Sequence, residues 1–380
     1  MNGAWKIAQA TGDHWGLIAK SAVAGLGDLP TDVNLGFVYL NEAMADDLSS
    51  IVTFLRETTP IQIWVGGVGF GVLGPDGFVD QDRAMVLMVG AVAPESLRLF
   101  TGFDPDAPAL FQAEHGAWLQ QQERVVAALV HGDPGEPRVP AMTAALARDN
   151  SIYLLGGLTV PGPGPRQTAG RVCEDGLSGI MLGDGVSLLT GLSQGCHPIG
   201  ELHRVTESVD NVVMSLDGQA ALEVMKAEAG DLIARDLHRA HGYIHIALPQ
   251  QGADDLNAYQ VRSLLAVDPH RGWIAVGERL QPGDTLMFVR RDPQAAQADF
   301  RRMLERLSGH LQGRKIAAGL YISCVGRGEH MFGGPNGEAE MIHRILGPFP
   351  LIGYSAAGEI CHDRLYGYTG ILCLLPEAAP

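Results

Sequence analysis

The sequence predicts an α+β protein made of two related halves, each a mixed β-sheet with helices on its outer face. The order strand, helix, proline, strand, glycine-rich turn, strand occurs in residues 35–92 and again in residues 319–375. Between these segments, short glycine-bounded apolar runs typical of antiparallel hairpins alternate with amphipathic stretches of helical period. We interpret this order as an internal duplication, and docking of the two sheets would give a four-layer αββα sandwich.

The first copy contains a glycine-rich segment whose spacing is similar to that of a nucleotide-binding loop. The predicted elements are a strand at 35–40, a helix at 44–55 and strands at 61–65 and 85–92. Gly69, Gly71 and Gly74 have the spacing of a dinucleotide-binding loop. The turn sequence 75–77 (Pro-Asp-Gly) follows where the phosphate-binding helix should begin, so nucleotide binding is not predicted here.

The last copy contains clear signals for where its helices begin and end. Asp292 and Pro293 suit the start of a helix that continues through apolar residues at 300–311. A second helix begins near Pro335 and stops at Gly347-Pro348, between strands predicted at 319–323 and 351–354, and a last strand follows at 370–375.

The middle of the chain mixes both kinds of element. Apolar residues from Phe111 to Leu129 predict one long amphipathic helix, and Leu222 to Leu237 predict another. Strands are predicted at 152–155 and 243–248, hairpins at 172–216 and further strands at 257–291. We place the domain boundary near Gly218, which gives domains 1–217 and 218–380.

Composition excludes several classes of protein. The 380 residues carry a net charge of −16, which argues against a nucleic-acid partner because binding to phosphates needs a basic surface. Met1–Ala10 lacks the pattern of a signal peptide, and no apolar run is long enough to cross a bilayer. The five cysteines are odd in number and widely spaced, so neither disulfides nor zinc is predicted. A cytoplasmic protein with reduced thiols fits these features.

Two charged residues at strand ends form the candidate site. Arg327 lies between Gly326 and Gly328, directly after an apolar strand, and Glu359 follows Gly358 after the next strand. These three glycines are also predicted to bind the ligand, because they would expose backbone N–H groups to it. In a parallel strand–helix–strand unit both strand ends meet at one edge, so these side chains are expected on one rim. An arginine and a carboxylate facing one cleft could pair the two charges of an α-amino acid. One alternative is that the two side chains pair with each other. Another is that Arg327 only satisfies a helix C-terminus or a buried carboxylate, and that Glu359 only accepts backbone N–H bonds of its own glycine turn.

Three further residues complete the predicted pocket, and none is assigned a catalytic role. Cys324 is predicted at the floor, either as a packed thiol or, beside an arginine, as a thiolate nucleophile. Tyr354 and Gln194 are predicted to line the walls. His238, His241 and His245 are close in sequence, but no acidic ligand is in register, so no metal site is predicted.

These same segments resemble a known family. Residues 323–328 (SCVGRG), 352–354 (IGY) and 358–360 (GEI) resemble the C-terminal half of the FIST family, and residues 193–200 (SQGCHPIG), Thr206 and 216–218 (LDG) resemble motifs closing its N-terminal half. The resemblance implies a FIST N-like domain at 1–217 and a FIST C-like domain at 218–380.

The resemblance also implies a function. Such proteins are predicted small-ligand sensory domains of bacterial signal transduction, so we expect an amino acid or similar metabolite in a cleft between the halves. Output would pass to a separate signalling protein such as a histidine kinase or a cyclase, and a homodimer is compatible with the sequence. No cofactor is predicted, although the resemblance leaves a haem-based nitric-oxide sensor as an alternative. An enzyme using Cys324 is the less favoured alternative.

Overall fold

The computed structural model describes residues 5–174, 176–230, 242–249 and 259–377. The chain forms two compact units, the first from residues 1–193 and 300–380 and the second from residues 194–299. The boundary predicted near Gly218 falls inside the second unit, in the turn after β16 (Val212–Leu216). Over the described residues, no helix combines the length and the apolar character needed to cross a membrane.

The predicted repeat is present in the first unit, with the expected strand order and directions. In one copy β2 is parallel to β3 and antiparallel to β6; in the other β22 is parallel to β23 and antiparallel to β26. The bounds of the first copy are β2 (Leu35–Asn41), η1 (Glu42–Asp47), α2 (Leu48–Thr58), β3 (Ile63–Gly69) and β6 (Ala84–Gly90). Those of the other are β22 (Ile316–Cys324), α8 (Gly328–Phe332), α9 (Gly337–Leu346), β23 (Leu351–Ala356) and β26 (Thr369–Pro376).

A third copy lies between these two, and the sequence analysis missed it. Strand β8 is parallel to β9 and antiparallel to β12. Its elements are β8 (Ala127–Gly132), α4 (Val139–Asn150), β9 (Tyr153–Leu158) and β12 (Leu177–Leu182). The prediction of one helix from Phe111 to Leu129 is wrong, because α3 (Pro108–Leu119) ends and β8 begins within that stretch. A strand buried on both faces has a continuous apolar run, which periodicity cannot distinguish from a helix.

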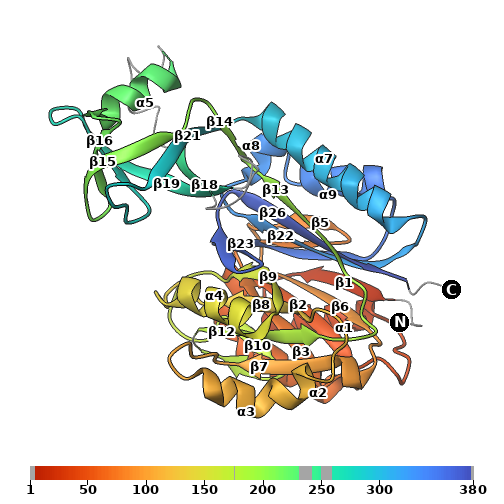
Figure 1. The fold of residues 1–380 in the computed structure, drawn as a ribbon. Helices are drawn as coiled ribbons and strands as arrows, with labels where there is room; N and C mark the ends of the chain where they lie inside the picture. The colour runs from red at the N-terminus through yellow and green to blue at the C-terminus, as the bar shows by residue number, and fades with distance from the viewer. Residues whose placement is uncertain (1–4, 175, 231–241, 250–258, 378–380) are drawn as a thin grey trace. The chain divides into compact units, whose positions relative to one another are not determined.

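Each copy donates a hairpin to the sheet of another copy. The hairpin β4–β5 of the first copy pairs with β23, β10–β11 of the middle copy pairs with β3, and β24–β25 of the last copy pairs with β9. The exchange is therefore cyclic among the three copies. Figure 1 shows part of it, with β5 next to the strands of the last copy and β10 next to β3. The hairpin strands are β4 (Val72–Gly74), β5 (Gly77–Val79), β10 (Gln167–Ala169), β11 (Val172–Cys173), β24 (Glu359–Cys361) and β25 (Arg364–Tyr366).

Edge strands complete three six-stranded sheets, ordered β1-β6-β2-β3-β10-β11, β25-β24-β9-β8-β12-β7 and β13-β26-β22-β23-β4-β5. These edge strands are β1 (Lys6–Thr11), β7 (Leu97–Thr101) and β13 (Leu189–Gln194). The sheet-on-sheet arrangement expected from two copies is thus extended by a third sheet.

Glycines mark the same position in all three copies. Gly66, Gly156 and Gly353 lie in the second strand of each copy, and a Cβ there would overlap the carbonyl oxygen of the paired residue on the first strand. The shared close approach of the two parallel strands supports a common origin for the copies.

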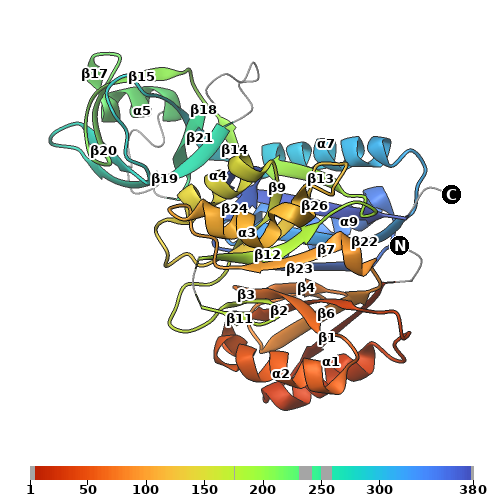
Figure 2. The ribbon, with the colours of Figure 1, turned by 60° about the horizontal axis from the view of Figure 1, so that its bottom comes forward.

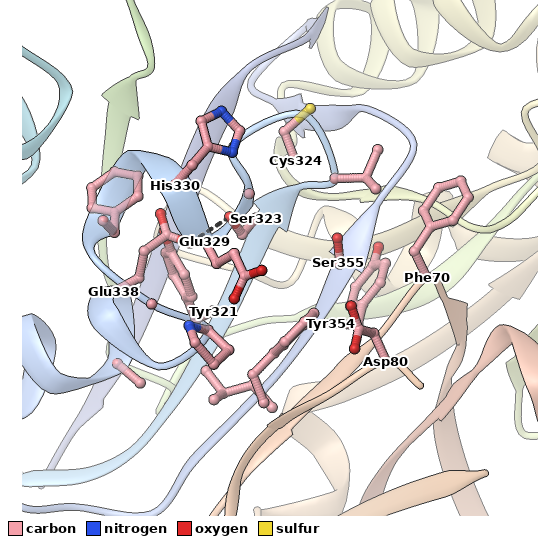
Figure 3. Close-up of a pocket in the computed structure, with 18 of the residues that line it drawn as sticks. Phe70, Asp80, Tyr321, Ser323, Cys324, Glu329, His330, Glu338, Tyr354 and Ser355 are labelled. Atoms are coloured by element: carbon pink, nitrogen blue, oxygen red, sulfur yellow. Dashed lines mark hydrogen bonds between the residues drawn. The ribbon is translucent and has the colours of Figure 1, made fainter. Parts of the chain in front are cut away.

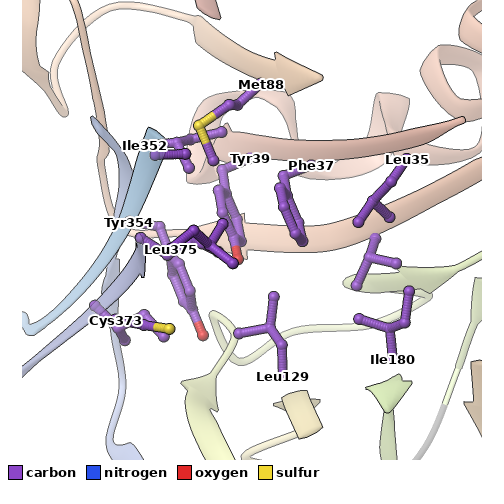
Figure 4. Packing of buried hydrophobic residues seen from close by; sticks show 14 of the residues in the cluster. Leu35, Phe37, Tyr39, Met88, Leu129, Ile180, Ile352, Tyr354, Cys373 and Leu375 are labelled. Carbon is purple, nitrogen blue, oxygen red and sulfur yellow. The ribbon is translucent and has the colours of Figure 1, made fainter. Parts of the chain in front are cut away.

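The inner faces of the three sheets share one apolar core. Tyr39, Leu129 and Ile352 belong to three different sheets, are at most 2% exposed and pack in the same cluster (Figure 4). The outer faces are covered by helices: α1 (Trp15–Gly25) and α2 cover the first sheet, and α3 and α4 the second (Figure 2). The third sheet carries α9 and α7 (Pro293–Leu311), the latter from Phe300 onward within this unit (Figure 1). The α+β class with outer helices is therefore confirmed.

The second unit is built on antiparallel strands. Its sheet order is β14-β21-β15-β16-β20-β19-β18, and an additional pairing between β18 and β21 closes it on itself. Its strands are β14 (Cys196–Pro198), β15 (His203–Val209), β16, β17 (Gln219–Ala220), β18 (Ile244–Pro249), β19 (Tyr259–Asp268), β20 (Trp273–Val276) and β21 (Thr285–Arg291). Helix α5 (Ala221–Ala229) covers the core, and the rest of the helix predicted to Leu237 lies outside the described residues.

Candidate functional site

A cavity of about 630 Å³ lies within the first unit, where the hairpin of the first copy meets the last copy (Figure 3). Strands β22 and β23 are paired in parallel up to Cys324 and Ala356, so both end at this edge, as predicted. The β4–β5 hairpin and the segment after it, through Gln81, form the facing wall, and α8 and α9 close the remaining side.

Aromatic rings and carboxylates make up most of the chemistry of the cavity wall. The rings come from both sides of the cavity, and the carboxylates come from the hairpin segment, α8 and α9. The aromatic residues are Phe70, Phe78, Tyr321, Phe332 and Tyr354, and the acidic ones are Asp80, Glu329 and Glu338. Among the described lining residues there is no lysine or arginine, and His330 is the single base. The wall is therefore acidic and aromatic.

Glu338 anchors the floor of the cavity. It lies in the first turn of α9 and accepts hydrogen bonds from the Tyr321 hydroxyl at 2.6 Å, Ser323 Oγ at 2.8 Å and Arg327 Nε at 2.7 Å. Three donors on one carboxylate fix its orientation and join α9 to the end of β22. The sequence analysis missed Glu338 because its partners are eleven to seventeen residues away, beyond any local pattern.

Arg327 is buried behind the cavity wall rather than exposed on a rim. Its side chain is 1% exposed, Nη1 donates to the Ser193 carbonyl at 3.2 Å, and the guanidinium carbon lies 4.6 Å from the centre of the Phe332 ring. Burial disfavours its charged form, but the carboxylate of Glu338 more than offsets this and raises the pKa. Arg327 does not line the cavity, and its Nη2 has no hydrogen-bond partner among the described residues.

Glu359 is also buried, at the start of β24. It is 0% exposed, and its Oε2 accepts hydrogen bonds from the Thr369 amide at 3.1 Å and the Thr369 hydroxyl at 2.6 Å. Desolvation raises the pKa of the carboxyl to about 8, against the opposing effect of the Thr369 hydrogen bonds. Glu359 does not line the cavity either. Arg327 and Glu359, predicted together on one rim, are therefore both buried beneath the surface.

The other predicted site residues divide between the cavity and its surroundings. Cys324, Gly328 and Tyr354 line the cavity, whereas Gly326 and Gly358 do not. Gln194 belongs to the second unit, where its side-chain amide donates to the Tyr259 carbonyl at 3.0 Å.

Burial, rather than the neighbouring arginine, decides the ionisation of Cys324. Desolvation, with Glu359 as a second cause, raises the pKa of its thiol well above the ordinary value, which opposes formation of a thiolate. All five cysteines are free in the structure.

The structure describes only one of the three histidines at which no metal site is predicted. His245 is buried on β18, whereas His238 and His241 lie outside the described residues. Within the described segments, no group of three histidine, cysteine or acidic side chains is placed to hold a metal ion.

The three copies create three comparable junctions, and side chains occupy two of them. Gly71, Arg166 and Gly358 precede the three hairpins at the same register position. Arg166 is 7% exposed and extends into its junction, where Nη1 donates to the Ala45 carbonyl at 3.1 Å. At the third junction Leu158 and Leu365 pack into an apolar cluster with Val139. The cavity thus lies at the junction preceded by Gly71, where neither a long side chain at this position nor a pair of leucines fills the space.

Sequence reasoning missed the hairpin wall of the cavity. The segment from Gly69 to Gly74 is predicted as a glycine turn of the repeat that binds no nucleotide, and Phe70 within it and Phe78 and Asp80 after it are not among the predicted site residues. The repeat could have indicated this wall, because the glycine turns of both predicted copies occupy the same place in the order of elements.

Comparisons with known proteins identify two family domains in this chain. The FIST N domain matches residues 34–219, and the FIST C domain matches residues 219–362. The uncharacterized protein Rv0628c of Mycobacterium tuberculosis (strain H37Rv) is 37% identical over 220 residues, which are 54% of this chain and 55% of the relative. The uncharacterized protein Mb0898c of Mycobacterium bovis is 34% identical over 218 residues, with the same shares. The chain spans about half the length of these relatives.

The two domain matches together extend over most of the sequence and meet at residue 219. They contain the β4–β5 hairpin, both strand ends and the two helices that enclose the cavity. FIST domains are sensory domains of signal transduction, and this chain belongs to the FIST family.

Proposed function

We propose that this chain is a small-ligand sensor and that its ligand, an amino acid or a similar metabolite bearing an amino group, binds in the cavity between β4–β5 and the last copy. The observation that carries the proposal is the asymmetry of the three junctions. Arg166 occupies one and Leu158 with Leu365 another, whereas the third retains a cavity of about 630 Å³, which is within the range of small-molecule sites.

The position of the cavity suits a sensor. Its walls come from the first and the last copy, so a ligand would contact segments more than 200 residues apart in the sequence. A ligand that binds one arrangement of these segments more tightly than another would shift the population toward that arrangement. We propose that a separate signalling protein, such as a histidine kinase or a cyclase, reads this change.

Haem, the alternative ligand, fits the cavity less well. His330 offers a ring nitrogen as an axial ligand, but the propionates of haem are anionic. Asp80, Glu329 and Glu338 face the cavity, and the described lining residues include no arginine or lysine that could pair with propionates. The carboxylates of the cavity wall therefore favour a ligand with positive rather than negative charge.

A pocket-filling substitution tests the proposal. Ala339 lies on α9 and lines the cavity, so Ala339→Phe should fill part of it without touching the Glu338 hydrogen bonds. In a thermal-shift screen against amino acids, amines, organic acids and haem, a ligand at a hundredfold its Kd should stabilise the wild type by about 2.7 kcal/mol. Ala339→Phe should abolish that shift.

The matched control is Arg344→Phe, which places the same ring on an exposed position of the same helix away from the cavity. It should retain the full ligand-induced shift. Equal shifts in the wild type, Ala339→Phe and Arg344→Phe would place the ligand elsewhere and contradict the proposal.

A further inference from the structure

The cavity has an excess of negative charge that no lysine or arginine among its described lining residues balances. Glu338 is neutralised by Arg327, with which it forms a hydrogen-bonded ion pair. Asp80 and Glu329 remain, and neither carboxylate has a hydrogen bond or an ion pair with any described residue. Both residues are exposed at the cavity, so their charges are available to a ligand.

The close-up view places these two carboxylates at the open space (Figure 3). Glu329 extends from α8 toward the centre of the cavity, and Asp80 lies on the opposite wall beside Tyr354. A ligand in the space between them would therefore lie between two negative charges.

The aromatic walls favour the same kind of ligand. The faces of aromatic rings carry partial negative charge and attract ammonium and guanidinium groups. One ring of the cavity already does so, because Phe332 stacks against the guanidinium of Arg327 at 4.6 Å. Phe70 and Phe78 on the hairpin side offer further ring surface to the cavity.

The carboxylate of a zwitterionic amino acid would find no lysine or arginine among the described residues that line the cavity. Arg327, the residue predicted to bind it, is 1% exposed and already paired with Glu338. Placing a carboxylate near Asp80 and Glu329 would bring like charges together, and like-charge juxtaposition strongly disfavours a ligand. The wall therefore discriminates between an amine and the corresponding amino acid.

We propose that the ligand of this cavity is an organic monocation with an apolar or aromatic body, such as an aryl-alkyl amine, whose ammonium group lies between Asp80 and Glu329. This inference rests on the proposed function and deepens it, because among the metabolites with an amino group proposed there it favours a cation over a zwitterionic amino acid. The net charge of −16 on the whole chain adds a long-range attraction for cations.

Four probes with one aromatic ring and different charge test the inference. They are 2-phenylethylammonium, neutral 2-phenylethanol, zwitterionic phenylalanine and anionic 3-phenylpropanoate, measured by titration calorimetry and thermal shift. We expect the cation to bind at least about tenfold more tightly than the alcohol or phenylalanine, and the anion to bind most weakly.

The double variant Asp80→Asn, Glu329→Gln removes both charges and keeps the shape of the side chains. It should weaken binding of 2-phenylethylammonium about tenfold and leave 2-phenylethanol within about twofold. The control Asp76→Asn removes an exposed carboxylate from the same hairpin, outside the cavity, and should change neither. Circular dichroism of each variant verifies that it is folded.

The outcomes separate this inference from the proposed function. If the alcohol or the anion binds as tightly as the cation and Ala339→Phe abolishes that binding, the cavity is a ligand site but its selectivity for cations is refuted. A cation whose binding is unchanged in the double variant, or that does not bind, also overturns the inference. Binding that survives Ala339→Phe contradicts the proposed function itself.

Discussion

At the scale of single residues, ion pairing and burial decide the roles of the predicted site residues. The sequence predicts a site at Arg327 and Glu359 because each lies next to glycine after a strand, and the structure does bring those strand ends together. The sequence contains no sign that Glu338 would bind the arginine first, because that contact depends on which face α9 turns toward β22. The type of element at each position could be predicted, whereas the partner of each side chain depends on long-range packing.

Glu359 should make stability depend on pH. The folded state raises the pKa of its carboxyl from the ordinary 4.5 to about 8, mainly through desolvation. As pH rises through this window the unfolded state loses the proton first, so this group reduces stability progressively between pH 4.5 and about 8, by a few kcal/mol in order of magnitude.

Glu359→Gln should remove that slope and stabilise the protein at pH 8. The middle copy already has glutamine at the equivalent position, since Gln167 and Glu359 both begin their hairpins and pair with Gly67 and Gly157. Urea unfolding of both proteins from pH 5 to 8 measures the difference. Glu207→Gln, at an exposed carboxyl, should leave the pH dependence unchanged, and parallel curves for the wild type and Glu359→Gln would refute this role.

At the scale of elements, the strand–helix–strand repeat was predictable in two copies and hidden in the third. The first and last copies are separated from their neighbours by glycine and proline, which mark the ends of strands. In the middle copy the apolar run 125–130 continues the hydrophobic pattern of α3, so the boundary at β8 was not visible. The exchange of hairpins has no local signature at all, because each hairpin pairs with a strand of a different copy.

The shared glycines give a prediction for these elements. In Gly156→Ala the new methyl group would overlap the Val130 carbonyl oxygen, and backbone cannot move aside in a paired parallel strand. We expect a loss of about 3 kcal/mol or more in the free energy of unfolding, measured with urea.

Gly309→Ala is the matched control. Gly309 lies within α7, and apart from the adjoining helix backbone no atom of the described residues lies within 4 Å of the position of an added Cβ. Alanine should therefore stabilise the helix by about 0.5–1 kcal/mol. A loss of less than 1 kcal/mol in Gly156→Ala would show that the close approach of the strands is not a constraint on the repeat.

At the scale of the whole first unit, the cyclic exchange of hairpins should make the three copies one cooperative structure. Each sheet contains strands from two copies or more, and the inner faces share a single core. A copy therefore cannot leave the structure without removing a hairpin from the sheet of its neighbour. Repeats that contact only sequential neighbours can unfold separately, and this connectivity excludes such a linear arrangement.

Ile360→Ala tests this cooperativity. Ile360 belongs to the hairpin of the last copy, is 0% exposed and packs in the apolar cluster under α3 and α4 of the middle copy. Truncating it should lower the free energy of unfolding by about 2–5 kcal/mol. Native-state hydrogen exchange should show the same decrease for the slowest amides of β2, β8 and β22, because all three open only with the unit as a whole.

Ile274→Ala, the same truncation in the core of the second unit, is the control, and its effect should be seen in the strands of that unit. A decrease confined to β8 and β9 in Ile360→Ala, with β2 and β22 unchanged, would mean that the copies open separately. The cavity would then join two independently moving bodies, and a ligand bound between β4–β5 and β22 would have to act by holding them together. If instead the three copies unfold as one, a ligand at one junction stabilises all three sheets, and the signal it produces is a property of the whole unit.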